Sequence, residues 1–313
     1  MFALRGIAVS LTFFVLLYCF LSALVAVSWR WLKLLRAAEQ SVADLLFVLR
    51  VLPLFASILI TAAFVVPSFD LLEPRSVNEG TGTLPLAFGA AALLLIALGS
   101  YRVISAQIRT SRIVAAWLEG ASPLDAAGQT TTLTLCSRRE TPPLTLIGMR
   151  EPLVLVSESA FALLGRDELQ VALRHELAHI RSWDNLKKLV FRFAPFPGLT
   201  KMESAWSQAA ELAADDAAVS NVSDALDLAA ALVKLSRLVP VEAAPACTVG
   251  FVTGSIRARI ARLLAWDESG NTRQWRIPRW LAIPPVVVAI LFALVTYGPV
   301  LAITHEMTEW LVR

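Results

Sequence analysis

The sequence predicts an α-helical membrane protein with four spans and one α+β domain inserted between the third and fourth spans. Two observations indicate this class. Hydrophobic residues make up 57% of the 313 residues and charged residues only 17%, which is too apolar for an ordinary soluble protein. The apolar residues also gather in four runs of the length that crosses a bilayer as a helix, roughly 20 residues.

The four runs lack the polar stripe that a buried core helix of this length normally carries. They cover approximately Ile7–Ser28, Leu46–Phe69, Leu84–Tyr101 and Leu281–Ile303. The chain is therefore expected to have three parts. Residues 1–104 hold three transmembrane helices with short loops, residues 105–278 form the inserted domain, and residues 279–313 hold the fourth helix and a short outer tail.

Lysine and arginine gather on one side of these spans, and this bias predicts their orientation. The basic residues on that side are Arg30, Lys33, Arg36, Arg50, Arg102, Arg109, Arg112, Arg273, Arg276 and Arg279. We therefore expect a multi-pass protein of the inner (plasma) membrane, with both termini outside and the inserted domain in the cytoplasm. Arg50, a little inside its span, is expected to snorkel to the cytoplasmic surface.

In the alternative orientation, the first run is a cleaved signal peptide and the domain faces outward. It is disfavoured because more positive charge follows that run than precedes it.

Composition also limits the partners and the kinds of site. The net charge of +3 is small and gives no reason to expect a nucleic-acid partner, whereas the apolar runs imply contact with membrane lipids. The three cysteines, Cys19, Cys136 and Cys247, are far apart and form no Cys-x-x-Cys pair. Neither a disulfide framework nor a thiolate zinc site is therefore expected.

The inserted domain, at about 175 residues, is long enough to bury a core of its own. Its first third alternates β-rich runs with turns, and the rest has a helical pattern in which Asp167 can cap a helix that ends at Arg181. The predicted strands are Thr131–Cys136, Leu144–Gly148 and Leu153–Val156. The further predicted helices are Leu186–Phe193, Lys201–Ser220, Ser223–Leu238 and Ser255–Ala265, with a break at Pro195–Gly198.

The segment Arg174-His175-Glu176-Leu177-Ala178-His179 contains the pattern His-Glu-x-x-His. Residues four apart share one face of a helix, so both imidazoles can bind the same ion. Glu176 projects beside that ion, where it can deprotonate a zinc-bound water. The alternative is a pair of surface histidines, but the apolar flanks predict a largely buried helix, and buried histidines need partners.

A catalytic zinc usually takes three protein ligands, and no third histidine remains in the domain. Glu211 is the best candidate, because the small residues around it let its helix approach the first closely. Asp215, one turn later, could accept the outer N–H of a ligating histidine. Two alternatives stay open: Glu211 could belong to a solvated helix face, and Asp184 could either orient a histidine or cap the next helix.

The run His175-Glu176-Leu177-Ala178-His179-Ile180-Arg181, with Asp184 following, resembles the BlaR/MecR-type integral-membrane zinc peptidases, as does Glu211-x-x-Ala214-Asp215. The resemblance covers most of the chain, and its specific motifs lie between about residues 144 and 216. It implies an α+β, zincin-like cytoplasmic metallopeptidase domain with one Zn²⁺ per chain, bound by His175, His179 and Glu211, and Glu176 as the catalytic base. The HtpX-type membrane peptidases share the zinc motif and are the nearest alternative family.

Two features depart from the family pattern. The best-known members carry an extracellular penicillin-sensing domain after the last span, where this sequence has about ten residues, so β-lactam sensing is not expected. The Trp-Phe-Asn-Pro stretch usual between the two zinc helices is replaced by Phe193-Ala194-Pro195-Phe196-Pro197.

The expected activity is zinc-dependent cleavage of a protein substrate in the cytoplasm or at the membrane, with a regulator of a signalling pathway as one candidate. Arg259 is a candidate for stabilising the oxyanion, and the alternative is that it is a solvated charge on its helix. The loop Asp70–Thr83 is too short for a sensor, so a separate sensor or regulator protein would supply any signal. The alternative function is a catalytically silent signalling or scaffold protein with a structural zinc.

Overall fold

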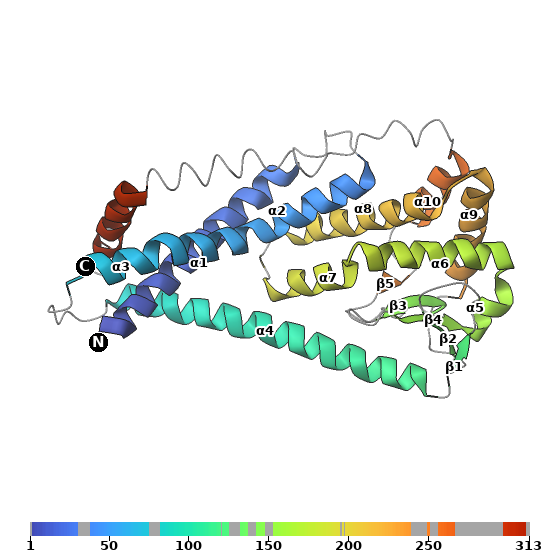
Figure 1. Ribbon diagram of the computed structural model, residues 1–313, viewed down its shortest axis with the longest axis horizontal. Coiled ribbons are helices and arrows are strands. Elements are labelled where there is room, and N and C mark those ends of the chain that lie inside the picture. Colours follow the sequence, from blue (N-terminus) through green and yellow to red (C-terminus); the bar gives the residue numbers. More distant parts are fainter. Residues whose placement is uncertain are drawn as a thin grey trace.

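The structure is a computed structural model. It describes residues 2–30, 38–74, 82–119, 121–124, 132–136, 142–147, 153–194, 196, 198–238, 249–250, 256–266 and 297–310. The molecule is elongated: α1, α2 and α3 form one end, and the other end combines a small sheet with the helices α5, α6, α9 and α10, while α4 runs from the first end to the sheet (Figure 1). Helices α7 and α8 lie between the two ends.

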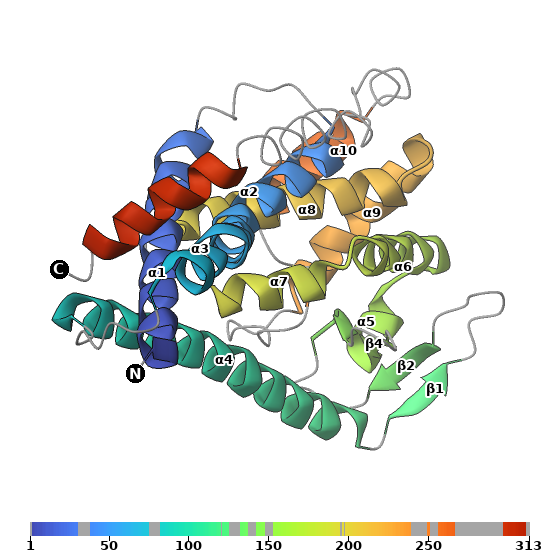
Figure 2. The same ribbon diagram turned by 60° about the vertical axis from the view of Figure 1, so that its left-hand side comes forward.

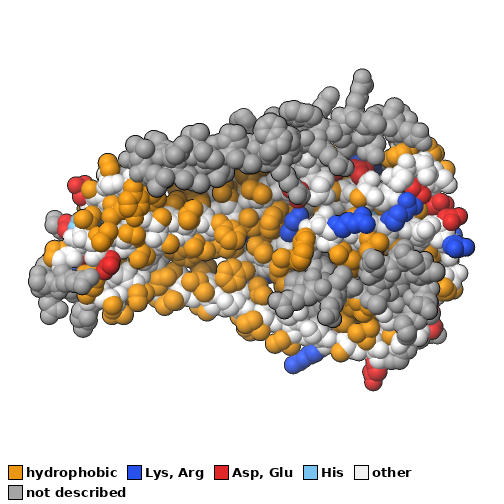
Figure 3. Space-filling model, viewed as in Figure 1, with side chains coloured by type: hydrophobic (Ala, Val, Ile, Leu, Met, Phe, Trp, Pro, Cys, Tyr) orange, Lys and Arg blue, Asp and Glu red, His pale blue; other side chains and the backbone are white. Residues whose placement is uncertain are grey.

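Among the described residues, three helices are long and apolar enough to cross a membrane: α1 (Phe2–Ser28), the continuous helix Glu39–Leu72 and α4 (Thr83–Leu118). Their outer surface is apolar, and Figure 3 shows that the visible charged side chains gather mainly over the other half of the molecule. Three of the predicted spans are thus present as helices. The fourth, Leu281–Ile303, lies mostly outside the described residues, and its end belongs to a helix over residues 297–310.

The second of these helices changes its winding near a proline. It consists of α2 (Glu39–Ile60), a π-helical turn (Thr61–Val65) and α3 (Val66–Leu72). Pro67 has no N–H to donate, and its ring would clash with the preceding turn of a regular α-helix. The wider π turn directly before it provides the space, so the chain stays helical through the proline.

Helix α4 continues 17 residues past the predicted end of its span at Tyr101, to Leu118. No glycine or proline interrupts this stretch, so nothing in the sequence ends the helix at the membrane surface. Near its end, Trp117 packs on Ile147 and Leu155 of the sheet. The boundary that we expected between residues 104 and 105 therefore falls inside a helix that links the membrane to the domain.

The domain contains a five-stranded sheet and six helices among its described residues. The strands are β1 (Ser122–Leu124), β2 (Thr132–Cys136), β3 (Leu144–Ile147), β4 (Leu153–Ser157) and β5 (Val249–Gly250), in the order β1-β2-β4-β3-β5. Only β2 and β4 pair in parallel. The helices are α5 (Glu158–Leu163), α6 (Arg166–Arg181), α7 (Asp184–Phe193), α8 (Thr200–Ala218), α9 (Val222–Ser236) and α10 (Ile256–Leu264).

The predicted strands and helices of the domain are confirmed to within two residues at most ends, but the predicted cap of α6 is wrong. The N-cap residue is Gly165, and Asp167 lies in the first turn of the helix. Glu168 accepts the Gly165 N–H at 2.7 Å and thereby satisfies a donor at the helix start. A carboxylate cap was predicted because Asp is a preferred N-cap residue, yet here the neighbouring glutamate reaches back instead.

The main core lies between the sheet, α6, α9 and α10, and Figure 2 shows the sheet beside α6. Its centre consists of Leu144 and Val156 from the sheet, Val171 from α6, and Leu228 and Leu232 from α9, none more than 1% exposed. This core also includes Ala218 of α8, so α6 is packed against the sheet, α9 and α8 together.

The turn between α7 and α8 lies among the membrane helices and is held by two of their polar side chains. Arg50 of α2 donates to the carbonyl of Ala194 at 2.6 Å and pairs with Glu203 of α8 at 2.8 Å. Tyr18 of α1 donates to the same carbonyl at 3.1 Å. The expectation that Arg50 snorkels to the surface is wrong, because its side chain is only 2% exposed. It donates instead to backbone carbonyls at the end of α7, which have no partner within the helix.

Gly99 of α4 marks the closest approach of a membrane helix to α7. A Cβ at this position would collide with the carbonyl oxygen of Phe193, the last residue of α7. The two helices can pack at this distance only because residue 99 has no side chain.

We therefore expect Gly99→Ala to lower the stability of the purified protein by about 1–3 kcal/mol, since overpacking forces the helices apart. Gly298→Ala is the matched control, because a Cβ there meets no atom of the described residues within 4 Å. Thermal unfolding in detergent micelles should show a lower midpoint for the first variant and an equal or slightly higher one for the second. Equal midpoints for the two variants would contradict the packing described here.

Candidate metal centre

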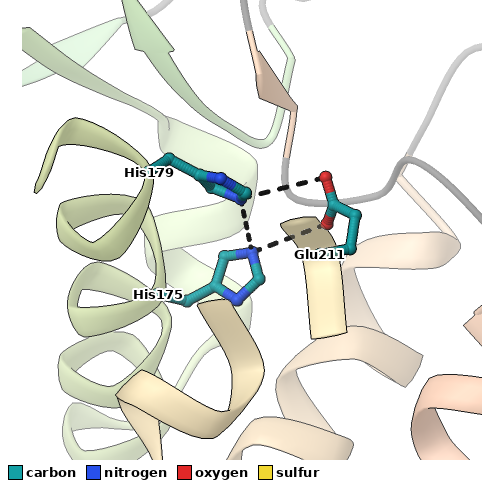
Figure 4. Close-up of side chains that lie close together, drawn as sticks. All are labelled: His175, His179 and Glu211. Atoms are coloured by element: carbon teal, nitrogen blue, oxygen red, sulfur yellow. Dashed lines mark hydrogen bonds and ion pairs between the residues drawn. The ribbon is translucent and has the colours of Figure 1, made fainter. Parts of the chain in front are cut away.

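The centre lies between α6 and α8, which pack against each other. Ala218, a small residue on the same face of α8 as Glu211, lies in the same buried core as Val171 and Ala172 of α6. Figure 4 shows His175 and His179 projecting from α6 toward Glu211 of α8. All three side chains are at most 3% exposed. The structure thus brings together the three residues that the sequence predicts as ligands.

The distances among the three side chains fit a single small ion. The two histidine Nε2 atoms are 3.2 Å apart. The Glu211 oxygens lie 3.6 Å from His175 Nε2 and 3.8 Å from His179 Nε2. Ligands that surround a tetrahedral zinc at its usual bond lengths are about 3.3–3.6 Å apart. This buried group could therefore hold a metal ion with little movement.

Each histidine has a carboxylate on the ring nitrogen that faces away from the other histidine. Asp184 lies 2.7 Å from His179 Nδ1, and Asp215 lies 3.0 Å from His175 Nδ1. A carboxylate at Nδ1 holds the proton there and leaves Nε2 as the metal-binding atom. Two roles were left open for Asp184, and the structure shows the first, contact with a histidine. Asp184 is the first residue of α7, and the N-cap residue of that helix is Trp183.

Arg259 of α10 lies on the far side of Glu211 and Asp215. Its Nε and Nη2 donate to Asp215 at 2.8 and 2.6 Å, and its Nη1 donates to Glu211 at 2.8 Å. The residue is 2% exposed, so the alternative of a solvated charge is wrong. The arginine fixes the carboxylates that contact the histidines.

These contacts set the charges in the centre. Burial opposes protonation of His175, but its hydrogen bonds to Asp215 and Glu211 outweigh burial and raise its pKa to about 9. Burial disfavours the charged form of Asp215, yet His175 and Arg259 overcome it and lower the pKa of Asp215 to about 2. The pKa of Glu211 is lowered in the same way, against its burial.

Glu176 differs from its neighbours in having no partner. Its side chain is fully buried, and neither carboxylate oxygen has a hydrogen-bond partner among the described residues. Burial raises the pKa of Glu176, although the adjacent histidines favour the charged form. Burying a carboxylate without a hydrogen-bond partner costs free energy of folding. The partner of Glu176 is therefore expected to be a group from outside the protein, such as water, a metal ion or a substrate.

Lys188 is a residue of the site that the sequence analysis missed. It lies on α7, one turn after Asp184. Its ammonium interacts electrostatically with the carboxylates of Glu211, Asp184 and Glu176, and this interaction favours its charged form. Burial nevertheless lowers the pKa of Lys188. The spacing of four residues between Asp184 and Lys188 was the available signal, because it places both side chains on one face of α7.

Two other acidic clusters do not contribute to this centre. Asp216 points away from the histidines and pairs with Arg262 at 2.7 Å, as expected from its position on α8. Glu73, His305 and Glu309 lie close together at the other end of the molecule, where Arg5 pairs with Glu73 at 3.0 Å. That second group is partly exposed, and the positive charge beside it is the Arg5 guanidinium.

Comparison with known proteins adds no further assignment. No protein-family model matches the sequence. A search of curated proteins likewise found no match.

The raised pKa of His175 predicts that metal affinity depends on pH. Below about pH 9 the metal-free site holds a proton on His175, and this proton must leave when an ion binds. The affinity for Zn²⁺ should therefore fall about tenfold for each pH unit below 9 and level off above it.

Competition with a chelator of known affinity between pH 6 and 10 measures this dependence. His175→Ala is the control, because it should lose nearly all bound zinc at every pH. An affinity that is independent of pH between 6 and 8 would show that His175 is already neutral in the metal-free protein.

Proposed function

We propose that this chain is a membrane-bound, zinc-dependent endopeptidase that cleaves a protein substrate at or near the cytoplasmic face of the membrane. The observation that carries the proposal is Glu176, a buried carboxylate without a partner beside a buried group of three metal-binding side chains. A site that only holds a metal has no use for such a carboxylate, whereas hydrolysis needs a base in this place.

The residues present fit zinc in the number and kind of their donors. His175, His179 and Glu211 offer two imidazole nitrogens and one carboxylate, a donor set that suits zinc and leaves a position open. When bound, zinc supplies Lewis-acid polarisation of a substrate carbonyl and of water. Asp184, Asp215 and Arg259 keep the three ligands oriented, and we assign no contact with substrate to them.

Glu176 acts as the general base and then as the general acid. Its carboxylate accepts a proton from the attacking water and returns it to the nitrogen of the leaving amine. The burial that raises the pKa of Glu176 also makes the return of the proton easier. Its position, one residue after His175, sets it beside both imidazoles without contact with the groups that orient them.

Lys188 is the better candidate for stabilising the oxyanion of the tetrahedral intermediate. Arg259, the earlier candidate, uses three nitrogens to bind Glu211 and Asp215. Lys188 approaches from α7 and brings a positive charge to the neighbourhood of Glu176. A cation in a partly buried position stabilises developing negative charge more than it would in water.

The membrane helices bear on the choice of substrate. The turn between α7 and α8 contacts α1, α2 and α4, so α8, which carries Glu211, begins beside the membrane helices. We place the domain in the cytoplasm on the basis of the lysine and arginine bias. Together with the motifs that resemble BlaR/MecR-type peptidases, this favours a membrane-proximal regulator as substrate and a separate sensor protein as partner.

The alternative is a silent signalling or scaffold protein with a structural metal. Four protein ligands and no open position would characterise such a site. The described residues offer three, and the neighbouring Glu176 has no structural task. The enzyme is therefore the interpretation that accounts for more of the site.

Glu176→Gln should bind zinc as the unchanged protein does but release no cleavage products, because the amide has the size of the carboxylate and cannot accept the proton. The measurement compares the new protein N-termini in cells that produce either form, together with the zinc content of the purified proteins. Identical sets of new N-termini would remove the peptidase proposal. Loss of zinc in the variant would show instead that Glu176 is a ligand.

Lys188→Met should lower kcat by roughly a hundredfold, which is the usual effect of removing one oxyanion donor. The KM and the zinc content should change little, since Lys188 is not a ligand. Lys234→Met is the control, because Lys234 pairs with Glu168 in the first turn of α6, two turns away from His175. A kcat equal to that of the control would show that another group stabilises the oxyanion.

A further inference from the structure

A second site lies where the first membrane helix ends against α8. A pocket of about 390 Å³ opens there, and its lining residues are Trp29, Arg30, Lys201, Ser204, Ala205 and Gln208. Val25 and Trp29 of the first helix pack on Met202 and Trp206 of α8, which fixes the two walls relative to one another. The pocket is thus part of a packed interface between two helices.

The pocket offers two positive charges that the described part of the chain does not neutralise. Arg30 and Lys201 come from opposite walls, are both exposed, and neither forms an ion pair with another described residue. Ser204 and Gln208 add polar groups one and two turns along α8, while Trp29 provides a buried aromatic wall. Two cations with hydroxyl and amide groups are a chemistry that recognises a phosphate group.

The pocket also sits at the level where lipid headgroups are expected. Arg30 is the second residue after the end of α1 at Ser28, so it lies at the predicted cytoplasmic end of a span. Tryptophan at this position is typical of a membrane interface. Val27 and Leu24, about one and two turns before Arg30, are exposed apolar residues on the same side of α1. An acyl chain can lie along them while its headgroup occupies the pocket.

We propose that this pocket binds the phosphate headgroup of an anionic phospholipid of the cytoplasmic leaflet. Anionic lipids are attracted to basic residues at that surface. The pocket adds a defined volume and polar groups to this general attraction, which makes the binding specific rather than diffuse. The proposal concerns a binding site on the membrane side of α8 and does not depend on the peptidase activity.

The test uses the purified full-length protein in detergent micelles and counts retained lipids by native mass spectrometry. The probes are phosphatidylglycerol, which is anionic, and phosphatidylcholine, which is zwitterionic. The unchanged protein should retain one phosphatidylglycerol in preference to phosphatidylcholine. The double variant Arg30→Gln/Lys201→Gln should weaken the retention of phosphatidylglycerol about tenfold or more.

Two further variants separate a built site from general attraction. Arg109→Gln/Arg112→Gln removes the same charge from exposed positions on α4 and should retain the lipid as the unchanged protein does. Ser204→Trp keeps every charge but fills the pocket, and it should release the lipid. Equal loss in the α4 control, or full retention in the two pocket variants, would overturn the proposal. Displacement of the lipid by millimolar inorganic phosphate would overturn the choice of a lipid and assign the pocket to free phosphate.

Discussion

The centre depends on one packing contact, that of α6 against α8. Two histidines a turn apart can define only one side of a metal site, and the third donor must come from another element at a fixed distance. Ala218, on the Glu211 face of α8, shares a buried core with Val171 and Ala172 of α6, and the Glu211 oxygens lie 3.6 and 3.8 Å from the two Nε2 atoms. A larger side chain at Ala218 would push α8 away from α6 and move the carboxylate out of reach of both histidines.

Helix α8 is held at both ends by buried arginines, and this holds Glu211 in place. Arg50 binds Glu203 near the membrane, and Arg259 binds Glu211 and Asp215 in the domain. Breaking a buried ion pair by moving one partner leaves a charge without compensation, which costs about 3–5 kcal/mol. Moving α8 relative to α2 or to α10 is therefore unfavourable. The position of Glu211 is thereby linked to the packing of the membrane helices.

The sequence was sufficient to predict what depends on local spacing. The His-Glu-x-x-His pattern, the partner Asp215 one turn after Glu211, and the helices of the domain all follow from periodicity. Contacts between distant elements could not be predicted in this way. Arg259 meets α8 from a helix more than 40 residues later in the chain, and Arg50 meets it from more than 140 residues earlier. Nothing in the residues next to either arginine distinguishes a buried partner of a carboxylate from a solvated charge.

The pairing pattern within the centre explains why Glu176 is suited to proton transfer. His175, His179, Glu211 and Asp215 each have an oppositely charged or hydrogen-bonding neighbour that holds their orientation. Glu176 has none among the described residues, and burial therefore favours its protonated form. A divalent cation bound beside it would add positive charge within a few ångströms and lower its pKa again. The carboxylate would then be available as a base only in the metal-loaded protein, so that one ion would assemble the ligands and ionise the base.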